Sequence, residues 1–271
     1  MHDFKLINKE SARRQILYAD GAIPISIIMY LDELTMTEFK ERVKGDLAVI
    51  LPIGAVEEHG SHLPLSTDTL QPVFVAEEVA KRLANCLVAP VIPYGQCSST
   101  KNFPGTLSLR FETVRALVYD LVCEFARHGI KNVAVLSGHA GRTHILAQKL
   151  ACEDALCENP DMKIMQLSDY DIAYELLGKR GWPKEDGHAG AVETSRVLAI
   201  RPDLVKMENA KDALPNFPSF RVLANPEKCF PSGVMGYPEM ADAKKGKELN
   251  EYIIGRLVEE IEKMRSETES K

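Results

Sequence analysis

The stretch that decides the fold is residues 47–68, which read LAVILPIGAVEEHGSHLPLSTD. It opens with an apolar run from Leu47 to Ile53, which is typical of a strand buried on both faces of a sheet. Carboxylate and imidazole side chains follow directly, between Glu57 and Asp68. Ligands of parallel sheets bind outside the carboxyl ends of the strands, so we expect a binding site in this loop.

Apolar runs alternate with segments of helical period along most of the chain. This alternation predicts an α/β fold in which helices wrap a mostly parallel central sheet. The other expected strands are Leu87 to Ile92, Asn132 to Leu136 and Lys163 to Leu167. The expected helices are Leu70 to Leu83, Phe111 to Phe125, Thr143 to Leu156 and a C-terminal helix with an apolar stripe at Leu249, Ile253, Leu257, Ile261 and Met264.

The composition bounds the class of protein. The chain has 271 residues, of which 45% are hydrophobic, so one domain spanning residues 1–271 is the simplest arrangement. A formal net charge of -6 without a basic block argues against a nucleic-acid partner and leaves a small molecule as the expected one. The apolar run from Ile23 to Leu31 is too short to span a bilayer and is interpreted as a buried strand. No signal peptide is recognisable, which predicts a cytoplasmic protein without a membrane partner.

Two segments stand outside the regular alternation. Residues 1–45 are expected to form an N-terminal extension. Residues 210–240 are expected to form a lid or a subunit-contact region, as long connections often do. Their prolines disfavour a continuous helix or a central strand, and they are Pro215, Pro218, Pro226 and Pro231.

The cysteines give no sign of a metal site. No C-x-x-C pair occurs among them, and in a reducing compartment we expect them to be small buried hydrophobic residues. A zinc site with sulfur ligands is therefore not predicted. The six cysteines are Cys86, Cys97, Cys123, Cys152, Cys157 and Cys229.

Two further polar clusters accompany the loop of residues 57–68. His139 follows the expected strand that ends at Leu136, and His188 lies near the start of an expected helix that carries Glu193. Carboxylate oxygen and imidazole nitrogen form the ligand set of zinc, manganese and Fe(II). The alternatives are a hydrogen-bonded core cluster for the first loop and, for the last one, an ordinary helix cap with a solvated Glu193.

The order and spacing of several motifs resemble the creatininase (creatinine amidohydrolase) family. The resemblance extends from about Leu47 to Leu198, with a weaker echo in GVMG at 233–236. The motifs are PIGAVEEHG at 52–60, HLP at 62–64, TD at 67–68, FPGTLSL at 103–109, GH at 138–139, HAG at 188–190 and ETS at 193–195.

This resemblance implies a three-layer α/β/α fold and a site for two divalent metals, drawn from zinc, manganese and Fe(II). Carried over position by position, Glu57 and His139 would hold one metal, His59 would hold the other, and Asp68 would bridge them. His188 matches the catalytic histidine of the family. The resemblance also implies a homo-oligomer, often a hexamer.

The chain departs from the family pattern two residues after His139. Creatininase itself has a glutamate there that supplies a ligand to the second metal, whereas this chain has Gly141. We expect Glu193 to act in its place, either as a metal ligand or as a general base.

Four residues are candidates for substrate binding. Arg142 would begin a helix, where its guanidinium could meet an anionic group, although a surface position is the alternative. Ser99 and Thr100 precede a turn that often shapes the pocket of the family. Trp182 could stack on a planar substrate, or it could pack in the core.

The resemblance and the residues together predict a metal-dependent amidohydrolase that cleaves a non-peptide C–N bond, in a cyclic amide or a formamide, through metal-activated hydroxide. His188 would protonate the departing nitrogen. One alternative is a metallopeptidase-like member that acts on a modified peptide. The other is a non-catalytic member that binds a metabolite.

Overall fold

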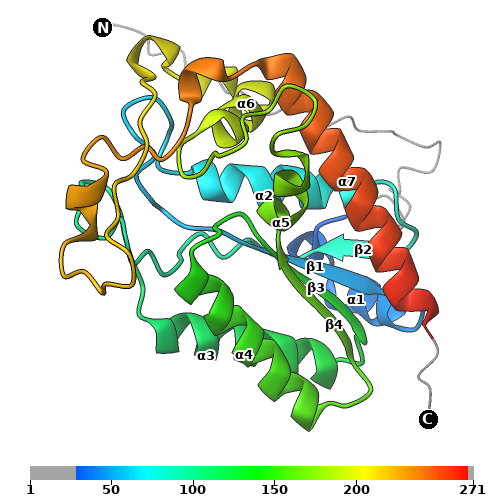
Figure 1. The fold of residues 1–271 in the computed structure, drawn as a ribbon. Helices are drawn as coiled ribbons and strands as arrows, with labels where there is room; N and C mark the ends of the chain where they lie inside the picture. The colour runs from blue at the N-terminus through cyan, green and yellow to red at the C-terminus, as the bar shows by residue number, and fades with distance from the viewer. Residues whose placement is uncertain (1–28, 268–271) are drawn as a thin grey trace, which may run out of the picture.

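A parallel sheet forms the centre of the molecule (Figure 1). The computed structural model describes residues 29–267. In this part of the chain the strand order is β2-β1-β3-β4, with β1 at Ala48–Ile53, β2 at Cys86–Val88, β3 at Asn132–Ser137 and β4 at Lys163–Ser168. The last residue of β1 pairs with the last residue of β3, so the loops that follow these two strands start side by side.

Helices cover both faces of the sheet, which confirms the three-layer α/β/α fold (Figure 1). Successive side chains of a strand point to opposite faces, so Ile50 enters the hydrophobic cluster on one side while Val49 and Leu51 enter the other. The first side carries α2 (Thr67–Ala80), α5 (Asp169–Ala173), α6 (Ala191–Ile200) and α7 (Ala243–Ser266). The second side carries α1 (Met36–Val43), α3 (Phe111–Arg127) and α4 (Arg142–Glu158).

The expected strand from Leu87 to Ile92 is wrong at its C-terminal end, because β2 stops at Val88. Pro90 has no N–H to donate to a neighbouring strand, so the chain leaves the sheet there. Ile92 returns through a single parallel bridge to Ile53. The segment after β2 therefore runs beside the loop that follows β1.

Most of the expected strand from Ile23 to Leu31 lies outside the described residues. Its described end makes an isolated parallel bridge from Tyr30 to Val88, and the short 3-10 helix η2 (Leu31–Glu33) follows. Between residues 29 and 267, none of the helices combines the length and apolar character needed to cross a bilayer.

The C-terminal helix α7 packs its apolar stripe against the sheet and α2, as the sequence predicts. Its N-terminus is capped by Asp242, whose carboxylate accepts a hydrogen bond from the backbone N–H of Lys245 at 2.7 Å. Burial of one aliphatic side chain of this size contributes about 1.5–3 kcal/mol. The buried stripe consists of Leu249, Ile253, Leu257, Ile261 and Met264.

Helix α6 is held by its neighbours rather than by the sheet. A Cβ atom at Gly246 would collide with the backbone carbonyl of Ser195, so the glycine allows α7 to approach α6 closely. Arg196 of α6 is fully buried and donates to Asn250 of α7 at 2.8 Å and to Asp169 of α5 at 2.5 Å. These contacts fix the position of α6 and of the side chains that it carries.

The chain between α6 and α7 is irregular, as the prolines predict. An isolated antiparallel bridge joins Ala213 to Gly236, and Phe220 and Val222 are fully exposed. A role of residues 210–240 as a lid or subunit contact stays a prediction. The short 3-10 helices are η3 (Tyr174–Leu176), which follows α5, and η4 (Pro202–Leu204), η5 (Met207–Asn209), η6 (Pro226–Cys229) and η7 (Pro238–Met240).

Candidate metal centre

The start of α2 is pressed between the loops that follow β1 and β3. A Cβ atom at Gly54 or at Gly138 would collide with the backbone carbonyl of Asp68. The two glycines therefore let Asp68, in the first turn of α2, lie at the carboxyl ends of both strands. Its side chain is buried at this edge of the sheet.

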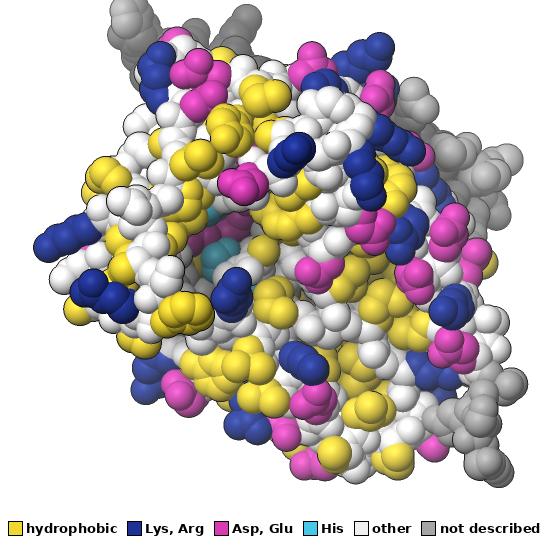
Figure 2. Space-filling view, viewed as in Figure 1, with side chains coloured by type: hydrophobic (Ala, Val, Ile, Leu, Met, Phe, Trp, Pro, Cys, Tyr) yellow, Lys and Arg dark blue, Asp and Glu magenta, His cyan; other side chains and the backbone are white. Residues whose placement is uncertain are grey.

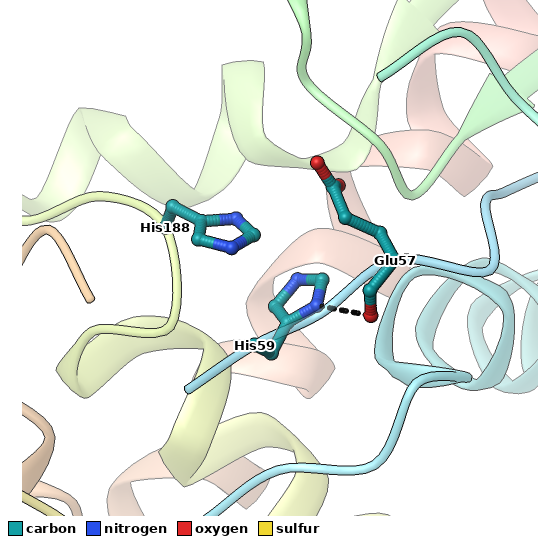
Figure 3. A group of neighbouring side chains, drawn as sticks. All are labelled: Glu57, His59 and His188. Carbon is teal, nitrogen blue, oxygen red and sulfur yellow. Dashed lines mark hydrogen bonds between the residues drawn. The ribbon is translucent and has the colours of Figure 1, made fainter. Parts of the chain in front are cut away.

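His59 presents one ring nitrogen to carboxylates. Its Nδ1–H donates to the backbone oxygen of Glu57 at 3.1 Å, which is the dashed contact in Figure 3. The Nε2 atom faces Asp68 Oδ1 at 3.0 Å and Glu193 Oε2 at 3.4 Å. We call this group, His59 with Asp68 and Glu193, the His59 position.

His139 has the same arrangement with its nitrogens exchanged. Its Nε2–H donates to the backbone oxygen of Gln96 at 3.1 Å. The Nδ1 atom faces Glu57 Oε2 at 2.8 Å and Asp68 Oδ2 at 3.0 Å. We call this group, His139 with Glu57 and Asp68, the His139 position. Asp68 thus offers one carboxylate oxygen to each histidine.

The donor set of both positions fits divalent cations. Glu57 Oε2, His59 Nε2 and Asp68 Oδ2 are buried and form no hydrogen bond of proper geometry with any residue between 29 and 267. Buried polar atoms without partners are costly unless something binds them. Histidine ligands of metals typically donate their second N–H to a carbonyl or carboxylate, as both histidines do here. In the core-cluster alternative, protons on His59 and His139 would have to take the place of the cations between these atoms.

The charges of the cluster shift the pKa values of its members. Burial alone lowers the pKa of His59, but the facing Asp68 and Glu193 raise it to about 10. Burial alone raises the pKa of Asp68, but the two histidines lower it well below its usual range. Since a metal ligand must give up its proton, a proton on His59 Nε2 and a metal cation compete for the same position.

Glu193 is placed by the entry into α6. Asp186 caps this helix, because its carboxylate accepts the backbone N–H groups of Ala191 at 3.0 Å and Val192 at 2.8 Å. Ala189 adopts a left-handed backbone with φ of 55° and donates its N–H to Glu193 Oε2 at 2.6 Å. Glu193 is therefore directed inward and buried, and the solvated alternative is wrong.

His188 lies over His59 at the edge of the centre, with the two ring centroids 4.2 Å apart (Figure 3). Its Nε2 contacts Glu58 Oε1 at 3.2 Å. Burial and the neighbouring His59 each lower the pKa of His188, but the contact with Glu58 and the charges of Glu57 and Glu193 raise it above its usual value overall. A histidine whose protonated form is favoured in this way can donate a proton near neutral pH.

The segment at 233–236 supports His188 from the outside. The backbone N–H of Met235 donates to the backbone oxygen of His188 at 2.8 Å. A Cβ atom at Gly233 would collide with the carboxylate of Glu58. In the space-filling view the acidic and histidine side chains lie at the base of a hollow with a mostly hydrophobic rim (Figure 2).

The four substrate-binding candidates lie in different surroundings. The buried Thr100 donates its hydroxyl to Glu57 Oε1, and Ser99 beside it is half-buried. Arg142 is exposed at the start of α4, and its guanidinium makes no hydrogen bond or ion pair within the described part of the chain. Trp182 is buried in the hydrophobic cluster beneath α7, with Lys245 Nζ 5.8 Å from its ring, so its packing matches the core alternative.

Cys97 also belongs to this cluster, although it lies outside the sequence motifs that predict the metal site. Its sulfur, one nitrogen of His139 and one carboxylate oxygen of Glu57 all lie within 4.8 Å of one another. Burial raises the pKa of the Cys97 thiol to about 11, although a hydrogen bond with His139 lowers it. The sequence signals it only weakly, through its place in the connection that follows β2, at the same edge of the sheet.

Comparisons with known proteins identify the family of this chain. A profile of the creatinine amidohydrolase (Creatininase) family matches residues 32–261. Creatinine amidohydrolase of Pseudomonas putida is 32% identical over 252 residues, which cover 86% of this chain and 96% of that protein. The mycofactocin precursor peptide peptidase of Mycobacterium ulcerans (strain Agy99) is 30% identical over 227 residues, covering 79% and 84%.

Solved structures match the whole fold. A creatininase structure with Mn gives a TM-score of 0.81 at 30% identity and covers 89% of this chain and 100% of the other. A creatininase mutant of Zn-Zn type gives 0.80 at 30% identity, covering 89% and 99%. The fold and the donor set define a metal-dependent hydrolase that acts on C–N bonds other than peptide bonds. The chain belongs to the creatininase family.

Proposed function

We propose that this chain is a dinuclear metal amidohydrolase that opens a cyclic amide or cleaves a formamide in a small molecule. The observation that carries the proposal is the placement of Asp68 between two histidines. Each histidine is fixed by a backbone carbonyl, and each directs its free nitrogen at a different oxygen of Asp68.

The two positions divide the remaining ligands. Glu57 completes the His139 position and Glu193 completes the His59 position, so Gly141 is not required as a source of a ligand. In this proposal Glu193 is a ligand rather than a general base, because its carboxylate is committed to His59 and to the N–H of Ala189. Zinc, manganese and Fe(II) all suit such oxygen and nitrogen donors.

When bound, divalent metals in such a centre polarise a carbonyl oxygen and lower the pKa of water to about 7. The chain's own residues then handle the leaving group. His188 lies beside the His59 position and, in its protonated form, can donate a proton to a departing nitrogen. Glu58 holds that imidazole and favours its protonated form.

The burial of the centre and its hydrophobic surroundings favour a small substrate. The ligand atoms are nearly inaccessible, and hydrophobic side chains surround the hollow (Figure 2). A second candidate substrate is a modified peptide, favoured by the 30% identity to a mycofactocin precursor peptide peptidase. We also propose a homo-oligomer, which the exposed Phe217, Phe220 and Val222 would favour as contact residues.

One experiment tests the proposed function. The protein is loaded with zinc, manganese or Fe(II), its metal content is measured, and amine release is followed over cyclic amides, formamidopyrimidines and short peptides. We expect about two metals per chain and release from a cyclic amide or formamide. Release from peptides alone would favour the second candidate. Bound metal without any turnover would favour a metabolite-binding protein, and no bound metal would refute the proposed centre.

A further inference from the structure

The His139 position has a potential ligand that the His59 position lacks. Cys97 is 1% exposed, and its sulfur lies in one cluster with His139 and Glu57. No cysteine belongs to the group formed by His59, Asp68 and Glu193. The two positions therefore differ in chemistry, although each has one histidine and two carboxylates.

The backbone around Cys97 holds the sulfur in place. The N–H of Cys97 donates to the hydroxyl of Ser108 at 2.9 Å, and the carbonyl of the preceding Gln96 accepts the Nε2–H of His139 at 3.1 Å. The segment that delivers the sulfur thus also orients the histidine of the same position. Such shared support is typical of a preorganised ligand set.

Glu57 gives an independent indication that a ligand binds beside Cys97. Thr100 binds the Oε1 atom of Glu57, whereas the buried Oε2 atom has no hydrogen-bond partner of proper geometry among the described residues. Gly141 has no side chain to offer as a ligand, and a Cβ atom there would lie 2.5 Å from His139 Nε2, so the ring would have to move to accept one. The loop after β3 therefore offers no further ligand, and the segment after β2 offers Cys97.

We propose that Cys97 binds the metal of the His139 position as a thiolate, and that this position selects zinc over manganese. This inference rests on the proposed dinuclear centre. On metal binding the thiol releases its proton to solvent and a sulfur–metal bond forms. Thiolate ligands favour zinc, whereas manganese prefers oxygen donors. With four protein ligands the His139 position is closed, which leaves the His59 position open for substrate.

Cobalt(II) provides a direct test, because a cobalt–thiolate bond gives a near-ultraviolet charge-transfer band. We expect this band in the full-length wild-type protein loaded with Co²⁺. The Cys97→Ser variant should lose the band while still binding cobalt, and the Cys152→Ser variant should keep it. Cys152 is a matched control, because it is also buried but packs in the hydrophobic cluster beneath α3 and α4.

Each other outcome counts against the inference in a defined way. Cobalt bound to the wild-type protein without the band, or a band that survives in Cys97→Ser, would overturn the assignment of Cys97 and leave the dinuclear centre intact. A wild-type protein that binds no cobalt would refute the proposed centre itself.

Competition between metals tests the selectivity. With zinc and manganese supplied together at limiting zinc, we expect Cys97→Ser to lose zinc affinity at one position by roughly tenfold or more, with a smaller change for manganese. Elemental analysis after desalting measures both. Equal losses for the two metals, or no loss, would contradict the proposed selectivity.

Discussion

The two positions of the centre are assembled by different parts of the fold. The His139 position is built from loops that follow β1, β2 and β3, together with the start of α2, so backbone pairing in the sheet sets its geometry. The His59 position needs Glu193, which comes from α6, and α6 is held by α5 and α7. One half of the centre is therefore built into the sheet, whereas the other depends on helix packing.

Removing Asp68, which both positions share, should affect the two positions alike and have the largest effect. In Asp68→Ala both positions lose a ligand, so we expect metal content to fall at both and kcat/KM to fall by at least about 10²–10³-fold. Elemental analysis and the amine-release assay measure the two effects. The exposed Asp120→Ala is the control and should keep full metal content. Two metals and normal turnover in Asp68→Ala would remove the bridging assignment.

Weakening the helix packing should damage the His59 position selectively. Arg196→Met leaves Asp169 buried without its partner, and breaking such a pair destabilises a protein by about 3–5 kcal/mol. We expect this loss in urea unfolding, together with reduced metal content at one position. The control is Arg201→Met, whose exposed ion pair with Asp203 contributes at most about 1 kcal/mol. Equal destabilisation by the two variants would contradict the role of the buried network.

The sheet-built half of the centre was the more accessible one from sequence. Period and length predicted the strands that carry it, and the rule for strand ends pointed to Glu57 and His139. The strand predicted from Leu87 to Ile92 extends too far, because the observed strand β2 stops at Val88, before Pro90. The roles of the two metals came from the family resemblance and not from the pattern.

Tertiary packing limited the rest of the prediction. The inward direction of Glu193 depends on the left-handed backbone at Ala189 and on the cap formed by Asp186, neither of which has a periodic signal. Cys97 is brought to His139 only by the path of the chain after β2. A sulfur site is usually recognised by the spacing between two or more cysteines. Cys97 is a single cysteine in the connection after β2, so it has no such spacing.

Removing only the helix-borne ligand should separate the two positions. In Glu193→Gln we expect roughly 10–100-fold weaker binding of one metal, because a neutral amide replaces a carboxylate ligand, while the second metal is retained. Metal titration followed by calorimetry resolves the two binding events. The exposed Glu185→Gln should leave both unchanged. Loss of both metals from Glu193→Gln would show that the positions are not independent.

The smallest effect is expected at the residue that holds His188. The pKa of this histidine is lowered by burial and by His59 but raised overall, and Glu58 is the foremost group that raises it. Glu58→Gln should therefore lower the pKa of His188. The proton donor acts in its protonated form, so activity declines as the pH rises above its pKa. With a lower pKa this decline should begin at a lower pH.

The pH profile of kcat tests this expectation in the metal-loaded protein. We expect the alkaline limb to move to lower pH and kcat at neutral pH to fall by about tenfold, which lies below the usual contribution of general acid–base catalysis. Metal content should not change, because Glu58 contacts His188 and not the two histidines that face Asp68. Glu78→Gln, which removes only a surface ion pair with Lys81, should leave the profile in place. If Glu58→Gln instead lost metal with an unshifted limb, Glu58 would support the His59 position and not the proton donor.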